Sequence, residues 1–179
     1  MFGSLGIIHG RFQPFHNQHL VYLRLAAARS DELLIGITNP ERGVNSLDCP
    51  DMNRNLPEEN PYSYWERFLM LEEVLKSERI KGRIVPFPIS EPGHLCHYIP
   101  DFGTHYLRVF DEWGEEKVRR LRQLGHNVVV LEEGASKTLT GSHVRTVMRE
   151  SGAWEELVPV PVARVLVQLE HEANCRSAS

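Results

Sequence analysis

The chain has 179 residues, and 20 lysines and arginines against 24 aspartates and glutamates give it a net charge of -4. Its length suits one substantial domain, and its 41% hydrophobic and 25% charged residues are typical of a soluble globular protein. The acidic balance argues against a dedicated nucleic-acid-binding protein, and no apolar run is long enough to span a bilayer. We therefore expect a cytoplasmic protein with neither a nucleic-acid partner nor a membrane partner.

The three cysteines, Cys49, Cys96 and Cys175, lie far apart and form no Cys-x-x-Cys pair. Neither a disulfide framework nor a structural zinc site is indicated by this spacing. Free thiols in a reducing cytoplasm are the simplest interpretation.

Buried strands and helices alternate through the first half of the chain. Continuous apolar runs at 4–9 and 32–37 predict two buried strands, and the leucine- and alanine-rich segment 19–29 predicts a helix between them. Strand, helix and strand in this order are typical of a parallel βαβ unit. The polar, proline-rich segment 39–62 predicts a long loop, and a helix is expected over 64–77.

Three more strands and three more helices are expected in the second half of the chain. The strands are predicted at 83–87, 104–110 and 127–131, and the helices at 115–124, 143–150 and 162–172. No internal repeat or linker divides the chain. We predict one α/β domain, a Rossmann-like doubly wound parallel sheet over residues 1–172, followed by a polar tail at 173–179.

The segment 10–19, GRFQPFHNQH, carries an arginine and two histidines where the first strand ends and the first helix begins. Doubly wound sheets bind ligands outside the carboxyl ends of their strands. His16 and His19 are three residues apart, so they project from one side of the first helical turn, where free backbone N–H groups favour an anion. Arg11 adds a guanidinium group suited to phosphate oxygens. This pattern indicates a phosphate-binding site.

A second segment near the carboxyl end of the chain has the same design. Thr140, Gly141 and Ser142 precede a predicted helix, and Arg145 lies one turn inside it. Two helix N-termini at one edge of the sheet would grip a polyphosphate between them. An ordinary helix cap is the commonest use of such hydroxyls, but Arg145 one turn later favours a phosphate-binding role. For the histidine pair of the first segment, a zinc site with His9 as third ligand is an alternative.

GRFQPFHNQH and LTGSHVR together resemble the two signatures of the nucleotidyltransferases with a His-x-Gly-His motif. Within that superfamily the chain is similar to the archaeal-type nicotinamide mononucleotide adenylyltransferases, and the likeness continues through segments 65–70, 86–89 and 152–159. The resemblance implies an in-line attack by an acceptor phosphate on the α-phosphate of ATP. Pyrophosphate would leave, and nicotinamide mononucleotide as acceptor would give NAD. Such an enzyme needs no protein nucleophile, so catalysis depends on positioning and charge stabilisation.

The resemblance also implies a role for each matched residue. His16 and His19 would hold the triphosphate and stabilise charge on the α-phosphoryl group. Arg11 and Arg145 would bind the β- and γ-phosphates. Mg²⁺ would be bound mainly through the triphosphate rather than by a metal site of the protein, and a homo-oligomer is expected as in the relatives. The nucleotide site would further be lined by Gly10, Phe12, Thr140, Gly141 and Ser142.

The chain departs from the archaeal pattern mainly on the acceptor side. Gln18 stands where the family has a glycine between the two histidines, and residues 111–114 replace a small Gly-Asn phrase. The basic residue expected before the turn 60–62 is absent, and Arg42 or Arg54 of the long loop would replace it. An aromatic ring after the third strand would stack on an acceptor ring. The candidate acceptor-binding residues are therefore Tyr98, His97, Trp113 and Arg54.

Two alternatives to NAD synthesis stay open. The altered segments 39–62 and 111–114 support a cytidylyl- or adenylyltransferase that acts on a different phosphate or phosphonate acceptor. A nucleotide-binding sensor without catalysis is of a different class, and only Gln18 supports it. The presence of both histidines and both arginines opposes the sensor, because a protein that only binds its ligand would be free to lose them.

Overall fold

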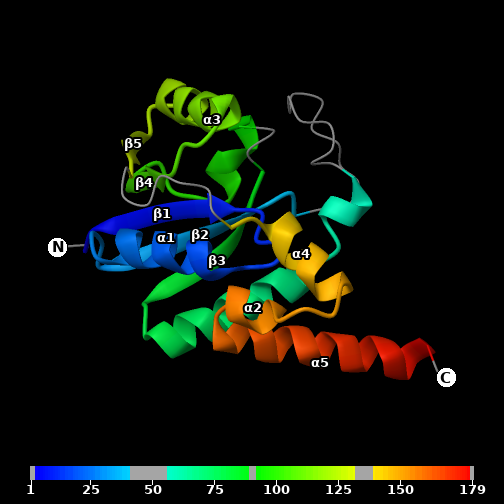
Figure 1. Cartoon of the computed structure of the whole chain (residues 1–179). Helices are drawn as coiled ribbons and strands as arrows, with labels where there is room; N and C mark the ends of the chain where they lie inside the picture. The colour runs from blue at the N-terminus through cyan, green and yellow to red at the C-terminus, as the bar shows by residue number, and fades with distance from the viewer. Residues whose placement is uncertain (1–2, 41–55, 89–91, 132–138, 178–179) are drawn as a thin grey trace.

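The computed structural model describes residues 3–40, 56–88, 92–131 and 139–177. Five parallel strands form one sheet in the order β3-β2-β1-β4-β5 (Figure 1). The strand order reverses between β1 and β4, which confirms the predicted Rossmann-like doubly wound sheet. The strands are β1 (Leu5–Gly10), β2 (Glu32–Thr38), β3 (Gly82–Phe87), β4 (Thr104–Leu107) and β5 (Asn127–Val130).

Helices cover both faces of this sheet (Figure 1). Four of them contribute to the core on one face: α1 (Asn17–Ala27), α2 (Tyr64–Glu78), α4 (Gly141–Arg149) and α5 (Val160–Ser177). On the other face lie α3 (Glu112–Gln123) and a short 3₁₀ helix, Pro92–His97. Further 3₁₀ helices, Pro57–Glu59 and Trp154–Leu157, precede α2 and α5.

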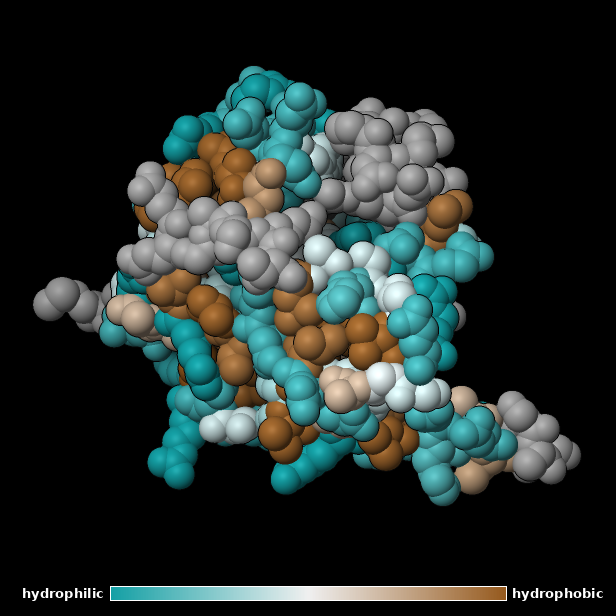
Figure 2. Space-filling model, in the orientation of Figure 1, coloured by the Kyte–Doolittle hydropathy of each residue, from teal (hydrophilic) through white to brown (hydrophobic). Residues whose placement is uncertain are grey.

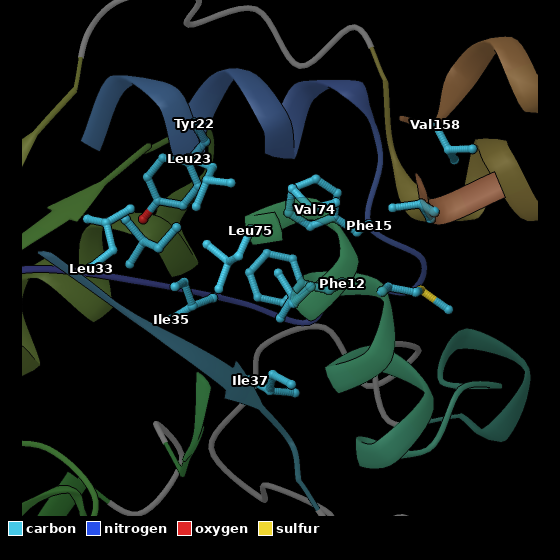
Figure 3. Close-up of a cluster of buried hydrophobic side chains, with 14 of the residues drawn as sticks. Phe12, Phe15, Tyr22, Leu23, Leu33, Ile35, Ile37, Val74, Leu75 and Val158 are labelled. Carbon is cyan, nitrogen blue, oxygen red and sulfur yellow. The ribbon is translucent and has the colours of Figure 1, made fainter. Parts of the chain in front are cut away.

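The buried side chains divide into two cores because successive strand residues point to opposite faces. Ile8 of β1 belongs to the core under α1, whereas the preceding Ile7 belongs to the core under α3. Figure 3 shows the first core, in which Leu23 of α1, Ile35 of β2 and Val74 of α2 lie in one cluster. Coverage of both faces explains why the central strands are continuous apolar runs in the sequence.

The predicted strand 104–110 is too long, since β4 ends at Leu107. Only Thr104 and His105 are paired with β1, and the chain then turns into α3. Asp111 begins this helix earlier than predicted because its side chain accepts a hydrogen bond of 2.8 Å from the Gly114 N–H. Residues 108–110 therefore lie at the carboxyl edge of the sheet rather than within it.

The last helix is longer than predicted. It was expected over 162–172, but α5 runs from Val160 to Ser177, so residues 173–177 of the expected polar tail belong to the helix, and residues 173–176 are exposed. The expected loop 39–62 contains the 3₁₀ helix Pro57–Glu59, and its segment 41–55 lies outside the described residues.

Hydrophobic side chains gather over the α3 and β5 end of the molecule, as Figure 2 shows. β5 forms one edge of the sheet and exposes Val129 and Val130. No helix in the described part of the chain is long and apolar enough to cross a membrane. A pocket of about 620 Å³ beside β5 is lined by Val109, Glu115, Val118, Arg119, Arg122, Gln123 and Val130.

His105 of β4 is a polar side chain inside the core under α3. It is fully buried, and neither ring nitrogen has a hydrogen-bond partner among the described residues. Its ring centre lies 4.7 Å from that of His126 and 6.2 Å from that of Phe87. Burial, and then the charge of His126, lower the pKa of His105 from 6.5 to about 3. The ring is therefore neutral in the folded protein at neutral pH.

Acid is expected to destabilise the protein in part through His105. Below about pH 6.5 the unfolded chain binds a proton on this ring that the folded chain does not, so the free energy of unfolding falls as the pH drops. Between roughly pH 7.5 and pH 5, the free energy of unfolding of His105→Leu should fall by about 2 kcal/mol less than that of the wild type. Urea unfolding at the two pH values measures this loss, with His171→Gln on the exposed end of α5 as control. An equal loss in wild type and His105→Leu would contradict the prediction.

Candidate active site

The first motif lies at the carboxyl end of β1, beside β4, where the strand order reverses. β1 ends at Gly10, and residues 11–16 lead into α1. Gly10 is required for close packing, since a Cβ atom there would lie 2.8 Å from the ring of Phe12. This switch point is where doubly wound sheets bind their ligands, so the loop lies where the sequence analysis expects a site.

The two motif histidines form one stacked pair. His16 is the N-cap residue of α1 and His19 lies in its first turn, with ring centres 3.7 Å apart and ring planes inclined by 20°. The His16 N–H donates a hydrogen bond of 3.3 Å to Nδ1 of His19. An acceptor at Nδ1 leaves the proton of the neutral His19 ring on Nε2. His19 can therefore present an N–H donor on the side of the ring away from the backbone.

Both histidines are held in the neutral state. Burial, and then the charge of Arg108, lower the pKa of His16 from 6.5 to about 4. Burial lowers the pKa of His19 well below its usual value, and His16, Arg108 and Arg11 add to the effect in that order. At neutral pH the pair can therefore donate hydrogen bonds to an oxyanion without carrying charge of its own.

The loop between β1 and α1 is anchored by two phenylalanines. The rings of Phe12 and Phe15 are almost completely buried, and Figure 3 shows them in the core cluster with Val74 and Leu75 of α2. Phe12 is expected from the resemblance to line the nucleotide site. Because its side chain lies in the core, a nucleotide contact by Phe12 is limited to its backbone, which has a positive φ of 53°.

Gln13 connects this loop to the segment before α2, and the sequence analysis missed it. Its Nε2 donates to the Tyr62 carbonyl at 2.9 Å, and the Tyr62 N–H donates to its Oε1 at 3.0 Å. The side chain is 4% exposed, so both bonds are shielded from water. A buried amide whose donor and acceptor are both satisfied by one backbone position fixes the two segments relative to each other.

Arg67 of α2 is a second connection that the sequence analysis missed. The side chain is 2% exposed, and its guanidinium group donates hydrogen bonds to four backbone carbonyls. The sequence contains a signal for it, since position 67 lies one turn before Leu71 on the apolar stripe of the helix, where a charge is unusual. The acceptors are the carbonyls of Thr38 (2.7 Å), Asn39 (2.8 Å), Arg11 (3.0 Å) and Ser63 (3.2 Å).

The second motif begins α4, as the sequence analysis expects. Thr140 is the N-cap residue, and its Oγ1 accepts a hydrogen bond of 3.1 Å from the His143 N–H. The Ser142 hydroxyl lies 3.0 Å from the same Oγ1 and is exposed. Because Thr140 rather than Ser142 is the cap, the helix starts at Gly141, two residues before the predicted start.

The two motifs contact each other through Gln13, Gly141 and Arg145. A Cβ atom on Gly141 would lie 2.4 Å from the Gln13 carbonyl oxygen, so only glycine allows this approach. Arg145 donates to the same oxygen at 2.5 Å and to Oε2 of Glu59 at 2.6 Å. The sheet therefore brings both motifs together as predicted, and the guanidinium group expected to bind phosphates is paired here with a carboxylate.

Replacing Gly141 with alanine is expected to force the start of α4 away from the first motif. Overpacking of this kind costs about 1–3 kcal/mol of unfolding free energy, which urea unfolding would measure. Gly93→Ala is the control, since an added Cβ there meets nothing within 4 Å. Equal stabilities of the two variants would show that the two motifs do not depend on this contact.

Arg108 is a further cation at the site that the sequence analysis did not single out. It directly follows β4, and its Nη1 donates to the Gln18 carbonyl in the first turn of α1 at 3.3 Å. Its charge lowers the pKa of both motif histidines. A basic residue near the carboxyl end of the predicted strand 104–110 was the available signal.

Among the described residues, no hydrogen bond or ring contact joins the predicted acceptor-binding residues to the histidine pair. His97 and Tyr98 are exposed at the end of the 3₁₀ helix after β3. Trp113 lies in the first turn of α3, with the guanidinium carbon of Arg120 5.2 Å from its ring centre. Arg54 falls in the segment outside the described residues.

No group of three or more histidine, cysteine, aspartate or glutamate side chains in the described ranges is arranged to hold a metal ion. The zinc alternative required His9 beside the histidine pair. His9 instead stacks on Phe87, with ring centres 4.4 Å apart and ring planes inclined by 7°. It follows Ile7 by two residues in β1 and so points to the face of the sheet under α3, away from α1.

Comparison with known proteins shows the family of this chain. The family model of cytidylyltransferase-like proteins matches residues 7–177 of the chain. A phosphonoformate cytidylyltransferase of Streptomyces viridochromogenes is 42% identical over 175 residues, which cover 96% of this chain and 95% of that protein. A nicotinamide-nucleotide adenylyltransferase of Thermococcus onnurineus is 29% identical over 169 residues, which cover 92% of this chain and 83% of that protein.

A solved structure supports the fold. The bifunctional NMN adenylyltransferase/ADP ribose pyrophosphatase from Francisella tularensis matches with a TM-score of 0.63 at 16% identity. The match covers 88% of this chain but only 45% of that one, so this chain spans less than half of its length. The solved structure shows the fold alone. The family match over nearly the whole chain and the similar relatives also indicate the class of reaction. The chain is a nucleotidyltransferase of the cytidylyltransferase-like family, within the superfamily that carries the His-x-Gly-His motif.

Proposed function

We propose that the enzyme transfers a cytidylyl group from CTP to a small phosphonate or phosphate acceptor. The observation that carries this proposal is the 42% identity, over nearly the full length of both chains, to the Streptomyces protein named for phosphonoformate cytidylyl transfer. Identity to the Thermococcus adenylyltransferase is 29%. The resemblance of the motifs favours ATP and nicotinamide mononucleotide first and the phosphonate acceptor second, and the two identities favour the reverse order.

The proposed reaction is a single in-line displacement. An ionised oxygen of the acceptor attacks the α-phosphorus of CTP, and a new P–O–P bond forms. The bond from the α-phosphorus to the bridging oxygen breaks at the same time, and pyrophosphate leaves with the electron pair. The acceptor is already ionised, so no general base is required. His16 and His19 would donate their N–H groups to the oxygens on which charge increases in the transition state.

The remaining groups would bind the triphosphate. Arg11 and the N-termini of α1 and α4 would contact its oxygens. Arg145 would have to exchange Glu59 for phosphate, since these two side chains are paired in the structure. Mg²⁺ would be held mainly by phosphate oxygens and water, as this cation commonly is. A homo-oligomeric assembly stays a prediction, which light scattering of the purified protein would test.

Adenylyl transfer from ATP to nicotinamide mononucleotide is the second candidate. The likeness of both motifs to the archaeal adenylyltransferases supports it, and the Tyr98 ring, 45% exposed, is available to stack on an aromatic acceptor. A small phosphonate would not need such a ring.

Pyrophosphate release in the presence of Mg²⁺ tests both candidates. CTP and ATP are each combined with phosphonoformate and with nicotinamide mononucleotide, and His16→Ala is the inactive control. Release that needs CTP, phosphonoformate and His16 would support the first candidate. Release that needs ATP and nicotinamide mononucleotide would replace it with the second. Absence of release from all four combinations would reject both acceptors.

A further inference from the structure

Arg108 lies where the chemistry proposed above would take place. It follows β4, and β4 and β1 are the two strands between which the strand order reverses. Its long hydrogen bond to the Gln18 carbonyl places the guanidinium group against the first turn of α1, between His16 and His19 in the sequence. The guanidinium carbon also lies 4.8 Å from the ring centre of Phe110, a cation–π contact that helps to hold the side chain in place.

The guanidinium group of Arg108 lacks an anionic partner in the described part of the chain. No ion pair joins it to an Asp or Glu there, and its Nε is buried without a hydrogen-bond partner. Arg145 differs, since it is paired with Glu59. Burial lowers the pKa of Arg108, which is the direction expected for a cation removed from water without compensation. A partly buried cation of this kind is stabilised by an anion bound beside it.

The neighbouring histidines need such a charge. Both rings are neutral, so they donate hydrogen bonds to an oxyanion without balancing its charge. The charge of Arg108 lowers the pKa of both rings, as expected of a cation close to the proposed place of the oxyanion. A guanidinium group can also donate two parallel hydrogen bonds to one phosphoryl or phosphonyl group.

We propose that Arg108 binds a phosphoryl or phosphonyl oxyanion held at the His16–His19 pair and exchanges its bond to the Gln18 carbonyl for that anion. This inference rests on the proposed nucleotidyl transfer for its setting. The oxyanion has two sources, the α-phosphate of the nucleotide and the acceptor itself. Arg108 is then a residue of the reacting centre in addition to the motif arginines Arg11 and Arg145.

Three variants test this proposal. Arg108→Met keeps the stem over Phe110 and removes the charge, whereas Arg108→Lys keeps the charge without the fork. Arg164→Met on the exposed side of α5 is the matched control. We expect kcat/KM of Arg108→Met to fall roughly 10- to 100-fold, with partial recovery in Arg108→Lys and no change in Arg164→Met. Circular dichroism establishes that each variant is folded.

Binding measurements distinguish the two sources of the oxyanion. Calorimetry gives the Kd of CTP, of phosphonoformate and of inorganic phosphate for each variant. A weaker Kd for CTP alone assigns Arg108 to the α-phosphate. A weaker Kd for phosphonoformate or inorganic phosphate, with that of CTP unchanged, assigns it to the acceptor. Wild-type values for all three ligands and for kcat/KM in Arg108→Met would overturn the proposal.

A third readout separates an electrostatic role from a merely structural one. Because Arg108 contributes to the low pKa of His16, Arg108→Met should raise that pKa from about 4, as NMR titration of the ring would detect. The same binding data distinguish this proposal from the proposed function. Arg108-dependent binding of CTP or phosphate without transfer would refute the function alone. Transfer and binding that are insensitive to Arg108→Met would refute the role of Arg108 alone.

Discussion

Arg67→Met should destabilise the protein more than any other single change considered above. It removes the guanidinium donor from four backbone carbonyls, those of Arg11, Thr38, Asn39 and Ser63, around a side chain that is 2% exposed. Of these, the Ser63 carbonyl keeps a hydrogen bond from the backbone N–H of residue 67. Buried polar groups that lose their partners are among the few causes of severe destabilisation. We expect a loss of at least about 3 kcal/mol in the free energy of unfolding, measured by urea unfolding.

Two companion variants show whether the geometry of Arg67 matters as well as its charge. Arg67→Lys keeps the charge, but a single ammonium group cannot reach carbonyls that a planar fork contacts on several sides, so an intermediate loss is expected. Arg164→Met on the surface of α5 should change stability by less than about 0.5 kcal/mol. If Arg67→Met were as stable as Arg164→Met, the described hydrogen bonds would not hold these segments together.

His16→Asn is expected to have the largest effect on catalysis with little effect on folding. Asparagine is a favoured N-cap residue, so the start of α1 is retained, while the imidazole N–H is lost from the stacked pair. Removal of one donor to a developing oxyanion costs roughly 10²–10³ in kcat. The measurement is pyrophosphate release under saturating substrate, with His171→Asn on the exposed end of α5 as control.

The pH dependence of the same assay gives an independent check. The pKa of His16 is about 4 because the ring is buried and faces Arg108. The neutral, donating form therefore persists well below the usual histidine pKa of 6.5. We expect no loss of kcat/KM from the histidine pair between about pH 6 and pH 8, with an acid limb only near the low pKa. A kcat above one-third of wild type in His16→Asn, or an acid limb at pH 6.5, would contradict the assigned role.

The position of the site follows from local features of the sequence. A strand that ends at Gly10 and a helix that starts with two histidines three residues apart require only short-range geometry. The alternation of buried strands and helices then predicts a parallel sheet, and a parallel sheet brings the ends of its strands to one edge. For this reason the meeting of the first motif with the second, at Gly141, was predictable although the two are far apart in the sequence.

The limits of individual elements were less predictable than their order. β4 was expected to reach Phe110 because residues 104–110 are largely apolar, but its pairing with β1 involves only two residues of each strand. Short pairing leaves Arg108 and Val109 outside the sheet. Hydrophobicity alone does not distinguish a strand residue from an apolar residue at the edge of the sheet. The position of Arg108 beside the site was therefore not predicted.

By itself, the amino-acid sequence determined the order of strands and helices, the spacing of the histidines and the caps that start the helices, because each depends on residues a few positions apart. The tertiary structure alone decided the rest. Arg67 binds the Thr38 carbonyl 29 positions away, and Arg145 binds the Gln13 carbonyl 132 positions away. Burial of the Phe12 side chain is likewise a result of packing, and it leaves the backbone of Phe12 for the predicted nucleotide contact. Which polar group meets which carbonyl depends on how the layers pack, and that is set by the whole core rather than by any local pattern.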